Sequence, residues 1–217
     1  MPYNSQIGQD QWVHSILGDK KDGYFVELGA CDGVHFSNTL YFERELGWNG
    51  ICIEPNPDYF ENLRKNRTCN VSDGLAYSHE DVSVSFSLCD VVSGIVDDNT
   101  NWLFTRADRV IEKKTTTLSK IFDTFSAPRI IDYLSLDVEG QEYNILSTFP
   151  FDKYQFRCMT VEHNAPHTGP EMQTKIRGVL EANGYKYVKG NDNIHNWNHG
   201  PIDDFYFFPE LLPDYVV

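Results

Sequence analysis

The sequence predicts a doubly wound α/β domain, in which seven strands form a mostly parallel sheet with helices on both faces and one antiparallel edge strand. Three observations predict this fold. Short apolar runs alternate with helical patterns along most of the chain. Acidic residues end four of the runs, at the edge where such sheets bind ligands. The 217 residues fit one domain of ordinary size, over residues 1–217.

The seven expected strands are apolar runs bounded by turn residues. The first, YFVEL, lies between Asp22-Gly23 and Gly29, and the second, GICI, ends at a Glu-Pro-Asn-Pro turn. Both runs are typical of buried parallel strands. A loop without a helical pattern separates the last two strands, which predicts an antiparallel hairpin at one edge. In order, the expected strands cover residues 24–28, 50–53, 75–77, 130–136, 156–161, 185–188 and 204–208.

Helices are expected between these strands. The pattern over 38–46 stops at Gly47, and a helix after Pro57 has the proline and acid that suit a first turn. The expected helices cover residues 38–46, 58–65, 118–125, 141–149 and 171–182. In the middle of the chain, VSVSFSL at 82–88 alternates with period two and predicts an antiparallel insert. Residues 91–117 are expected to form a long loop with short strands.

Charge and composition limit the class of partner. Asp and Glu number 32 against 18 Lys and Arg, for a net charge of -14. A protein that binds a phosphate backbone or an anionic membrane needs the opposite sign, so neither partner is expected. The five cysteines are scattered without a CxxC pair, which argues against a disulfide framework or a zinc site. No signal-peptide pattern or membrane-length apolar run is visible, so we expect a cytoplasmic protein.

The first two strand ends indicate the kind of ligand. ELGACDG at 27–33 follows the first strand, and Gly29 permits a tight turn and a close approach to a ligand. The Ala-Cys pair after it breaks the glycine triad of dinucleotide-binding motifs, and Glu27 and Asp32 would repel a pyrophosphate. A cationic ligand without phosphate, such as S-adenosylmethionine, fits better. Glu54 ends the second strand, where a carboxylate can accept hydrogen bonds from both ribose hydroxyls.

Several motifs occur in the order that one known family shows. They are SQIGQD near the start, ELGACDG, SNT at 37–39, IEPNP, and LSLDVEGQEYNIL with VEHN downstream. From about residue 5 to 208, the chain resembles the FkbM-type S-adenosylmethionine-dependent methyltransferases. The resemblance implies the class I methyltransferase fold, which is Rossmann-like. It also implies methylation of a hydroxyl oxygen, often on a sugar or a natural product.

The same resemblance implies a set of cofactor-binding residues. These are Gln6, Gln9, Glu27, Gly29, Ala30, Ser37, Asn38, Glu54, Asp73, Ala76 and Asp137. Glu27 and Gly29 would hold the methionine part, and Glu54 the ribose. Asp73 and Ala76 would lie beside the adenine, while the two glutamines, the serine and the asparagine would close over the cofactor. A plain helix cap is the alternative for the two glutamines.

The catalytic candidates stand at two later strand ends. An alcohol is a poor nucleophile until its proton leaves, so a carboxylate, a histidine or a metal is expected near the methyl group. Asp137 ends one strand and Glu162-His163-Asn164 the next, which makes Asp137, His163 and Glu162 the catalytic candidates. Asp137, Glu162 and Asn164 would also form an all-oxygen site for magnesium, the layout of the catechol methyltransferase type. Without a metal, Asp137 or His163 would be the general base, and a hydrogen-bonded core residue is the alternative for His163.

Other polar residues have weaker assignments. Glu139 and Glu142 stand between a strand end and the first turn of an expected helix, where they belong to the site or simply offset the helix dipole. The loop 195–199, with one tryptophan among histidines and asparagines, suits a sugar or is simply a solvent-exposed turn. His167 and the stretch 91–102 would complete the acceptor pocket.

The expected function is methyl transfer to a hydroxyl of a sugar, a glycan or a small molecule, with a terminal deoxyhexose as the favoured acceptor. An acidic surface favours a neutral acceptor. Because the fold begins almost at the first residue, the chain also suits a module of a larger glycan-assembling protein. The alternatives are an NAD-dependent oxidoreductase, a non-catalytic glycan-binding module on the same fold, and a glycosidase with paired carboxylates.

Overall fold

The chain forms a seven-stranded main sheet and a four-stranded second sheet. These come from a computed structural model, which describes residues 2–97, 107, 109–188 and 202–215. In the main sheet the strand order is β10-β11-β9-β8-β1-β2-β3. The pairs β1–β2, β1–β8, β2–β3 and β8–β9 are parallel, and β11 is antiparallel to both of its neighbours. The predicted fold class and the antiparallel hairpin at one edge are therefore confirmed.

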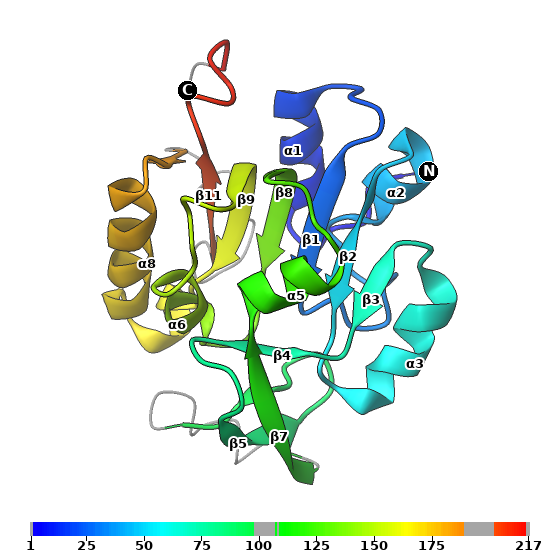
Figure 1. Ribbon diagram of the computed structural model, residues 1–217, viewed down its shortest axis with the longest axis vertical. Coiled ribbons are helices and arrows are strands. Elements are labelled where there is room, and N and C mark those ends of the chain that lie inside the picture. The colour runs from blue at the N-terminus through cyan, green and yellow to red at the C-terminus, as the bar shows by residue number, and fades with distance from the viewer. Residues whose placement is uncertain (1, 98–106, 108, 189–201, 216–217) are drawn as a thin grey trace.

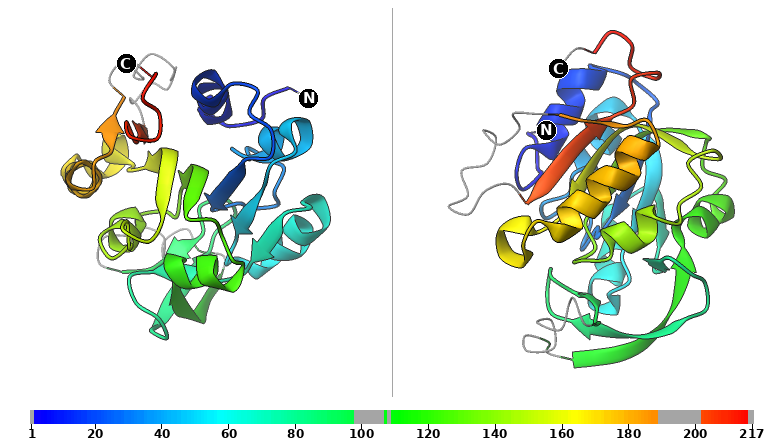
Figure 2. Two further views of the ribbon diagram at one scale, coloured as in Figure 1. Left: turned by 45° about the horizontal axis from the view of Figure 1, so that its top comes forward. Right: turned by 90° about the vertical axis from the view of Figure 1, so that its left-hand side faces the viewer.

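Helices lie on both faces of the main sheet (Figure 1). Its strands are β1 (Tyr24–Leu28), β2 (Asn49–Ile53), β3 (Asn70–Ser72), β8 (Ile130–Leu136), β9 (Gln155–Glu162), β10 (Lys186–Tyr187) and β11 (Asp203–Phe207). One face carries α1 (Gln9–Leu17), α2 (Leu40–Leu46) and α3 (Pro57–Asn66), and the other carries α5 (Leu118–Thr124), α6 (Glu142–Leu146) and α8 (Glu171–Ala182) (Figure 2). The short helix α7 (Ala165–Thr168) follows β9.

Side chains of the central strands alternate between two apolar clusters. On β1, Phe25 packs in the cluster that contains Trp12 and Phe42 of α1 and α2. Its neighbour Val26 belongs to the opposite cluster, with Phe122 of α5. Because both faces are covered, these strands appear in the sequence as nearly continuous apolar runs, which is why their positions could be predicted.

The second sheet corrects one expected strand. It contains β4 (Leu75–Tyr77), β5 (Ser83–Leu88), β6 (Gly94–Ile95) and β7 (Arg109–Thr117), in the order β4-β7-β5-β6. Residues 75–77 do form a strand, but it pairs with β7, and β3 is the third parallel strand of the main sheet. The sequence of β3 is NVS, and all three residues are half-buried, so it has no apolar pattern to reveal it.

The stretch 91–117 contains more regular structure than the loop that we expected. Its nine-residue strand β7 is rich in lysine and threonine, and only Thr115 in it is buried. A strand with such a solvated sequence lacks the apolar alternation used to recognise strands. The predicted antiparallel insert is confirmed, because β5 pairs antiparallel with both β6 and β7. Residues 98–106 and 108 lie outside the described part of the chain.

Two helices also differ from expectation. α1 was not among the expected helices, although its Trp12 and Val13 are buried against the sheet. The helix expected over 141–149 is shorter, at Glu142–Leu146, because Ser147 begins a turn that leads to the buried Phe149.

A buried arginine ties the helices of one face to the sheet. Arg67, which ends α3, has a fully buried side chain, and its Nη1 lies 3.2 Å from Glu27 Oε2. Its Nε lies 2.7 Å from Glu43 Oε2 of α2. The guanidinium also donates to Ser37 Oγ at 3.1 Å and Thr39 Oγ1 at 2.8 Å. One side chain thus links β1, the loop after it, α2 and α3.

The Arg67→Met substitution should lower the free energy of unfolding by about 3–5 kcal/mol, because it leaves the Glu27 and Glu43 carboxylates buried without a counter-charge. Urea denaturation of the ligand-free protein would measure the loss. The matched control is Arg64→Met on α3, whose side chain is exposed and forms an ion pair with Glu61. It should change the free energy by about 0.5 kcal/mol or less. Equal unfolding midpoints for the two variants would contradict the role of Arg67.

Candidate active site

A cavity of about 680 Å³ lies at the carboxyl ends of β1, β2, β8 and β9, between the main and the second sheet. Glycine and carboxylate residues at the strand ends form one wall. Leu75, Phe86 and Ile95 of the second sheet contribute apolar side chains to the opposite wall. Doubly wound sheets bind ligands at this position, and the volume suits a nucleoside with room beside it.

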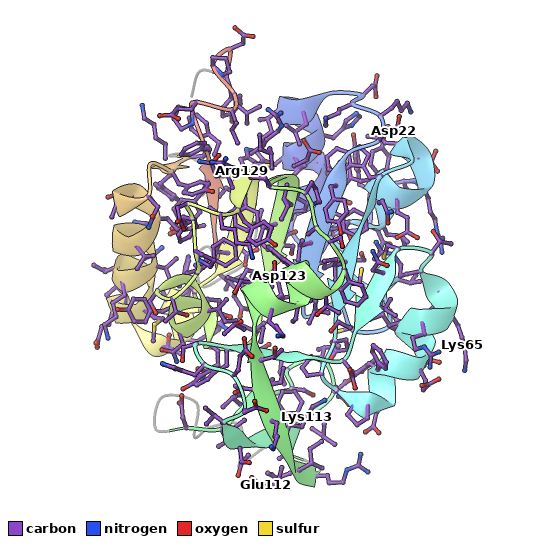
Figure 3. All side chains as sticks on the ribbon, viewed as in Figure 1. Asp22, Lys65, Glu112, Lys113, Asp123 and Arg129 are labelled. Carbon is purple, nitrogen blue, oxygen red and sulfur yellow. The ribbon has the colours of Figure 1, made fainter. Side chains whose placement is uncertain are left out.

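Most of the predicted cofactor-binding residues line this cavity. They are Gln6, Gln9, Glu27, Gly29, Ala30, Ser37, Asn38, Glu54, Ala76 and Asp137. Asp73 is the exception, because its side chain is exposed and it does not line the cavity. Its backbone oxygen instead accepts a hydrogen bond from Nζ of Lys113 at 3.1 Å. Figure 3 shows Lys113 on β7. The contacts of these residues with a cofactor stay predictions.

The cavity wall is acidic. The carboxylate residues that line it are Glu27, Glu54, Asp90, Asp137, Glu139 and Glu162. Among its described lining residues there is no lysine or arginine, and the titratable bases are His35 and His167. Such a wall favours a cationic ligand and disfavours a phosphate or pyrophosphate.

Gly29 is required by the protein backbone itself. Its φ is +74°, and a Cβ at this position would lie 2.1 Å from the carbonyl oxygen of Asp137. The amides of Gly29 and Ala30 donate to the carbonyl of Ile53, at 3.1 and 3.2 Å. The glycine therefore lets the ends of β1, β2 and β8 pack closely around the cavity, in addition to any approach of a ligand.

Glu27 is already bonded by the protein. Its carboxylate accepts hydrogen bonds from Ser37 Oγ at 2.9 Å, Asn38 N at 2.6 Å and Thr39 Oγ1 at 2.6 Å, as well as from Arg67. The side chain is only 3% exposed. We therefore expect Glu27 to act mainly by positioning the loop 37–39 against a methionine group, and less by bonding that group directly.

Glu54 lies at the end of β2, as the sequence predicts. Its carboxylate accepts hydrogen bonds from the amides of Cys31 at 2.8 Å and Asn56 at 2.7 Å. These two hydrogen bonds and the nearby Lys113 lower the pKa of Glu54. Burial has the larger effect and raises the pKa to about 7. A buried carboxylate with remaining lone pairs can accept further hydrogen bonds from a ligand's hydroxyls.

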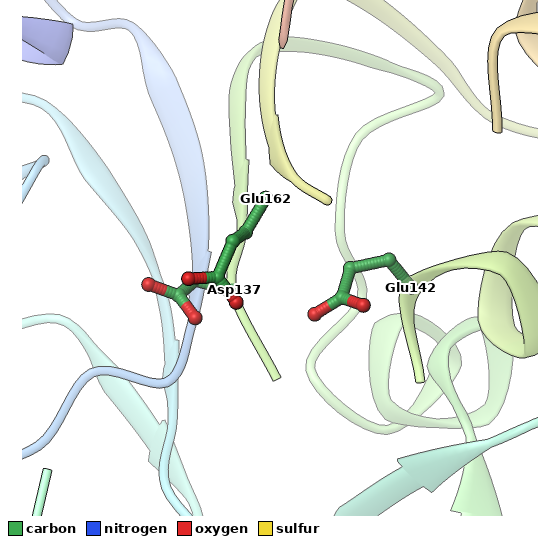
Figure 4. A group of neighbouring side chains, drawn as sticks. All are labelled: Asp137, Glu142 and Glu162. Carbon is green, nitrogen blue, oxygen red and sulfur yellow. The ribbon is translucent and has the colours of Figure 1, made fainter. Parts of the chain in front are cut away.

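Three carboxylates gather beside the cavity, which Asp137 and Glu162 line. One oxygen from each of Asp137, Glu142 and Glu162 lies within 4.8 Å of the others, and the three side chains point toward one another (Figure 4). Among the described residues, Glu162 Oε2 has no hydrogen-bond partner, although Glu162 is only 6% exposed. The amides of Val138 and Gly140 donate to Glu142, at 2.9 and 3.1 Å.

Burial dominates the electrostatics of this acidic cluster, which comprises Asp137, Glu142 and Glu162. It raises the pKa of Glu142 to about 7 and that of Glu162 well above its ordinary value. Burial also raises the pKa of Asp137, although a hydrogen bond with Glu162 opposes this change. Without a cation, burial therefore favours the protonated form of these three carboxyls.

For Glu142 the sequence favours a role in offsetting the helix dipole over a role in the site, and the structure places it in the acidic cluster as well. Its side chain is 1% exposed and lies in the acidic cluster. The signal that could have revealed it is Gly140, with φ +103°, which turns the chain so that a residue at the start of α6 faces the end of β8. Asn164, the other expected metal ligand, lines the cavity and precedes α7 with a φ of +51°.

His163 is not placed as a base for the acceptor. It is buried, does not line the cavity, and its Nδ1 accepts a hydrogen bond from the amide of Ala165 at 3.0 Å. Its Nε2 lies 3.5 Å from Asp204 Oδ1. Burial opposes ionisation of Asp204, but hydrogen bonds from Arg177 and His163 lower its pKa to about 2. His163 thus holds the start of α7, and the exposed His167 of that helix lines the cavity instead.

Two further expectations concern loops and membranes. The loop 195–199, assigned to a sugar or to solvent, lies outside the described residues. Of the stretch 91–102, the residues Val91, Val92, Ser93 and Ile95 line the cavity.

In the described part of the chain, no helix has the length and apolar character needed to cross a bilayer.

Comparison with known proteins identifies the family. A family model of the methyltransferase FkbM domain matches residues 27–187, which is more than half of the chain. A solved structure from Clostridium thermocellum, described as an rRNA-methylase, is similar with 12% identity and a TM-score of 0.53, over 95% of this chain and 97% of that one. The METTL16 MTase domain is similar with 13% identity and a TM-score of 0.50, over 92% of this chain and 65% of that one.

At such low sequence identity, these similarities show the fold alone. The fold is that of the class I methyltransferases, as the sequence predicts. A search among curated proteins finds no match. The match to the family model covers the strand ends that build the cavity, from Glu27 to the acidic cluster. The chain belongs to the FkbM family of S-adenosylmethionine-dependent methyltransferases.

Proposed function

We propose that this chain transfers the methyl group of S-adenosylmethionine to a hydroxyl oxygen of a neutral sugar or glycan, with a deoxyhexose as the favoured acceptor. One observation carries the proposal. Six acidic residues line a cavity at the strand ends, and its described lining has no lysine or arginine. S-adenosylmethionine brings an ammonium and a sulfonium but no phosphate, so its charges match this wall.

The cofactor is proposed to lie across the ends of β1 and β2. Glu54 would accept hydrogen bonds from the ribose hydroxyls, beside the amide bonds that it already accepts. Ser37 and Asn38 would border the methionine part, and Ala76 would lie beside the adenine. The bound cofactor supplies an activated methyl group, so the protein has to align the acceptor, exclude water and remove one proton.

Asp137 is proposed to take the proton of the acceptor hydroxyl. It lies at the end of β8 with Glu162 beside it, and both line the cavity. The raised pKa of Asp137 brings its basicity closer to that of a useful general base. Glu162 keeps Asp137 hydrogen-bonded and takes part in holding the proton. The amide side chains of Gln6 and Asn164 in the same wall suit the other hydroxyls of a sugar.

A divalent cation, magnesium in the first place, is proposed as an additional component of this site. Hard cations prefer carboxylate and amide oxygens, and Asp137, Glu142, Glu162 and Asn164 offer them. When bound, such a cation would lower the pKa of an acceptor hydroxyl. The orphaned Oε2 of the buried Glu162 fits a ligand atom of this kind.

The alternatives are less well supported. An NAD-dependent oxidoreductase would have to place a pyrophosphate against the acidic wall, beside Glu54 and Asp137. A non-catalytic glycan-binding module would have no use for a buried proton-retaining acidic cluster. The net charge of -14 likewise supports a neutral acceptor over a nucleic acid.

The proposed reaction can be tested by incubating the protein with S-adenosylmethionine and neutral methyl glycosides, including methyl α-L-rhamnopyranoside. Mass spectrometry should show a gain of one methyl group in place of a hydrogen on the sugar. Binding of S-adenosylhomocysteine with no methylated sugar would instead favour the glycan-binding module.

Asp137→Ala should lower the turnover number by about 10²–10⁴-fold, because the acceptor hydroxyl loses its general base. Release of S-adenosylhomocysteine gives the rate. Asp123→Ala is a matched control, because Asp123 is an exposed aspartate of α5 that pairs with Lys153 (Figure 3). An Asp137→Ala variant with the wild-type rate would remove Asp137 from the chemistry.

Cofactor affinity should fall as the pH is lowered through the pKa of Glu54, which is about 7. The ribose hydroxyls donate to the carboxylate, which predominates above this pH, and protonation below it removes the better acceptor. The dissociation constant of S-adenosylhomocysteine should therefore rise by up to about tenfold from pH 8 to pH 6. Calorimetry measures it. Glu54→Gln should bind more weakly and lose most of this slope, and an unchanged slope in the variant would exclude Glu54 as its source.

Chelation should lower turnover, and added magnesium should restore it, if a cation binds at the acidic cluster. Glu142→Gln should raise the magnesium concentration needed for half-maximal rate while keeping cofactor affinity. Full activity in the presence of excess EDTA would remove magnesium from the proposal and leave Asp137 as the sole base.

A further inference from the structure

One aromatic side chain stands half-exposed in the wall of the cavity. Phe36, in the loop between β1 and α2, is 47% exposed. An exposed aromatic ring at a ligand site offers a large apolar face against which a ligand can pack. Among the described large apolar residues that are exposed, Phe36 and Val91 line the cavity. The cofactor residues assigned above do not include either of them.

The backbone at Phe36 is strained. Its φ is +55°, a left-handed conformation that is unfavourable for a residue with a large side chain. Conformations of this kind persist when the surrounding structure imposes them, and they gather at functional sites. A glycine would relieve the strain at this position but would provide no ring.

Hydrogen bonds fix the loop on both sides of Phe36. Before it, Asp32 Oδ1 accepts from the amides of Val34 at 2.9 Å and His35 at 2.8 Å. After it, Glu27 accepts from the amide of Asn38 at 2.6 Å. Arg67 also donates to the carbonyl of Gly33 at 3.3 Å. The ring is therefore presented on a rigid support, which reduces the entropy lost when a ligand binds to it.

His35 extends the aromatic surface. The ring centroids of His35 and Phe36 are 3.9 Å apart, with an angle of 39° between their planes. Both residues line the cavity, which elsewhere carries the amide groups of Gln6 and Asn164. An aromatic ring beside amides, in a wall without described lysine or arginine, suits a ring that has an apolar C–H face and hydroxyls at its edge.

We propose that Phe36 is the stacking platform for the acceptor, and that the acceptor is a pyranose whose apolar face packs on this ring. The inference rests on the proposed function and narrows its substrate class to ring sugars, in place of open-chain alcohols or charged molecules. Val91, 46% exposed, provides the opposing apolar contact from the second sheet's side of the cavity. Phe36 acts by binding and orientation, so it takes no part in the transfer of the proton.

The test uses the full chain saturated with S-adenosylhomocysteine and a pair of probes. Methyl α-L-rhamnopyranoside has a ring face, whereas rhamnitol carries similar hydroxyls on an open chain. Saturation-transfer NMR titrations should show binding of the pyranoside, with the strongest transfer to the hydrogens of one ring face, and much weaker binding of rhamnitol. Phe36→Ala should raise the dissociation constant of the pyranoside by about tenfold. Phe36→Tyr, which keeps the ring, should restore the affinity.

Controls separate this inference from the proposed function. Val82→Ala removes an apolar side chain that is 39% exposed but outside the cavity lining, and it should bind like the wild type. Affinity for S-adenosylhomocysteine, measured by calorimetry, should be the same in all variants. Loss of cofactor affinity in Phe36→Ala would assign the ring to the cofactor and overturn the platform. So would equal binding of the two probes, no detectable pyranoside binding, or an unchanged pyranoside affinity in Phe36→Ala. Absence of cofactor binding in the wild type would overturn the proposed function itself.

Discussion

The geometry of the site depends on a buried ion pair between Arg67 and Glu27. Glu27 lies at the end of the central strand β1 and would carry an uncompensated charge in the core without a partner. Arg67 provides that partner and also bonds Glu43 and the hydroxyl of Thr39. Because the same carboxylate accepts from the loop 37–39, the ion pair fixes the wall against which a methionine group would lie. A single guanidinium therefore connects the stability of the sheet to the shape of the cavity.

The second constraint on this molecule is the negative charge of the cavity wall, which no lysine or arginine of the described lining offsets. Arg67 neutralises Glu27, but the acidic cluster has no cation in the described part of the cavity lining. Burial raises the pKa of all three of its carboxyls. The protein retains protons there as long as no cationic ligand enters, and a bound sulfonium or metal ion would favour their release. Under the proposed function, binding and proton release are coupled in the pocket where the acceptor hydroxyl would lose its own proton.

The sequence predicts the parts of the fold that are buried on both faces. The central strands appear as apolar runs, and the acids at their ends, Glu54, Asp137 and Glu162, do line one cavity. It does not predict β3 or β7, because their residues are polar or half-exposed and the pairing partner alone makes them strands. Arg67 was missed for a related reason, since a lone arginine after a helix gives no local sign that its charge is buried.

The residues of the candidate site divide in the same way into those that the sequence predicts and those that it does not. Residues next to strand ends could be placed from sequence, because parallel strands bring their carboxyl ends to one edge. Glu142 and Phe36 depend on backbone turns at Gly140 and at Phe36 itself, both with positive φ, and these direct side chains in ways that residue spacing does not reveal. The sequence could not decide between a base and a core residue for His163, and only the structure shows that its Nδ1 accepts a hydrogen bond from the Ala165 amide outside the cavity lining.

The central claim is that the acidic cavity accepts a cationic nucleoside without phosphate. Calorimetric titration of the ligand-free protein with S-adenosylmethionine and with NAD, at one pH and salt concentration, tests it most directly. Saturable binding of S-adenosylmethionine with one site per chain, together with no detectable binding of NAD, is the predicted result. Binding of NAD that excludes S-adenosylmethionine would contradict the claim.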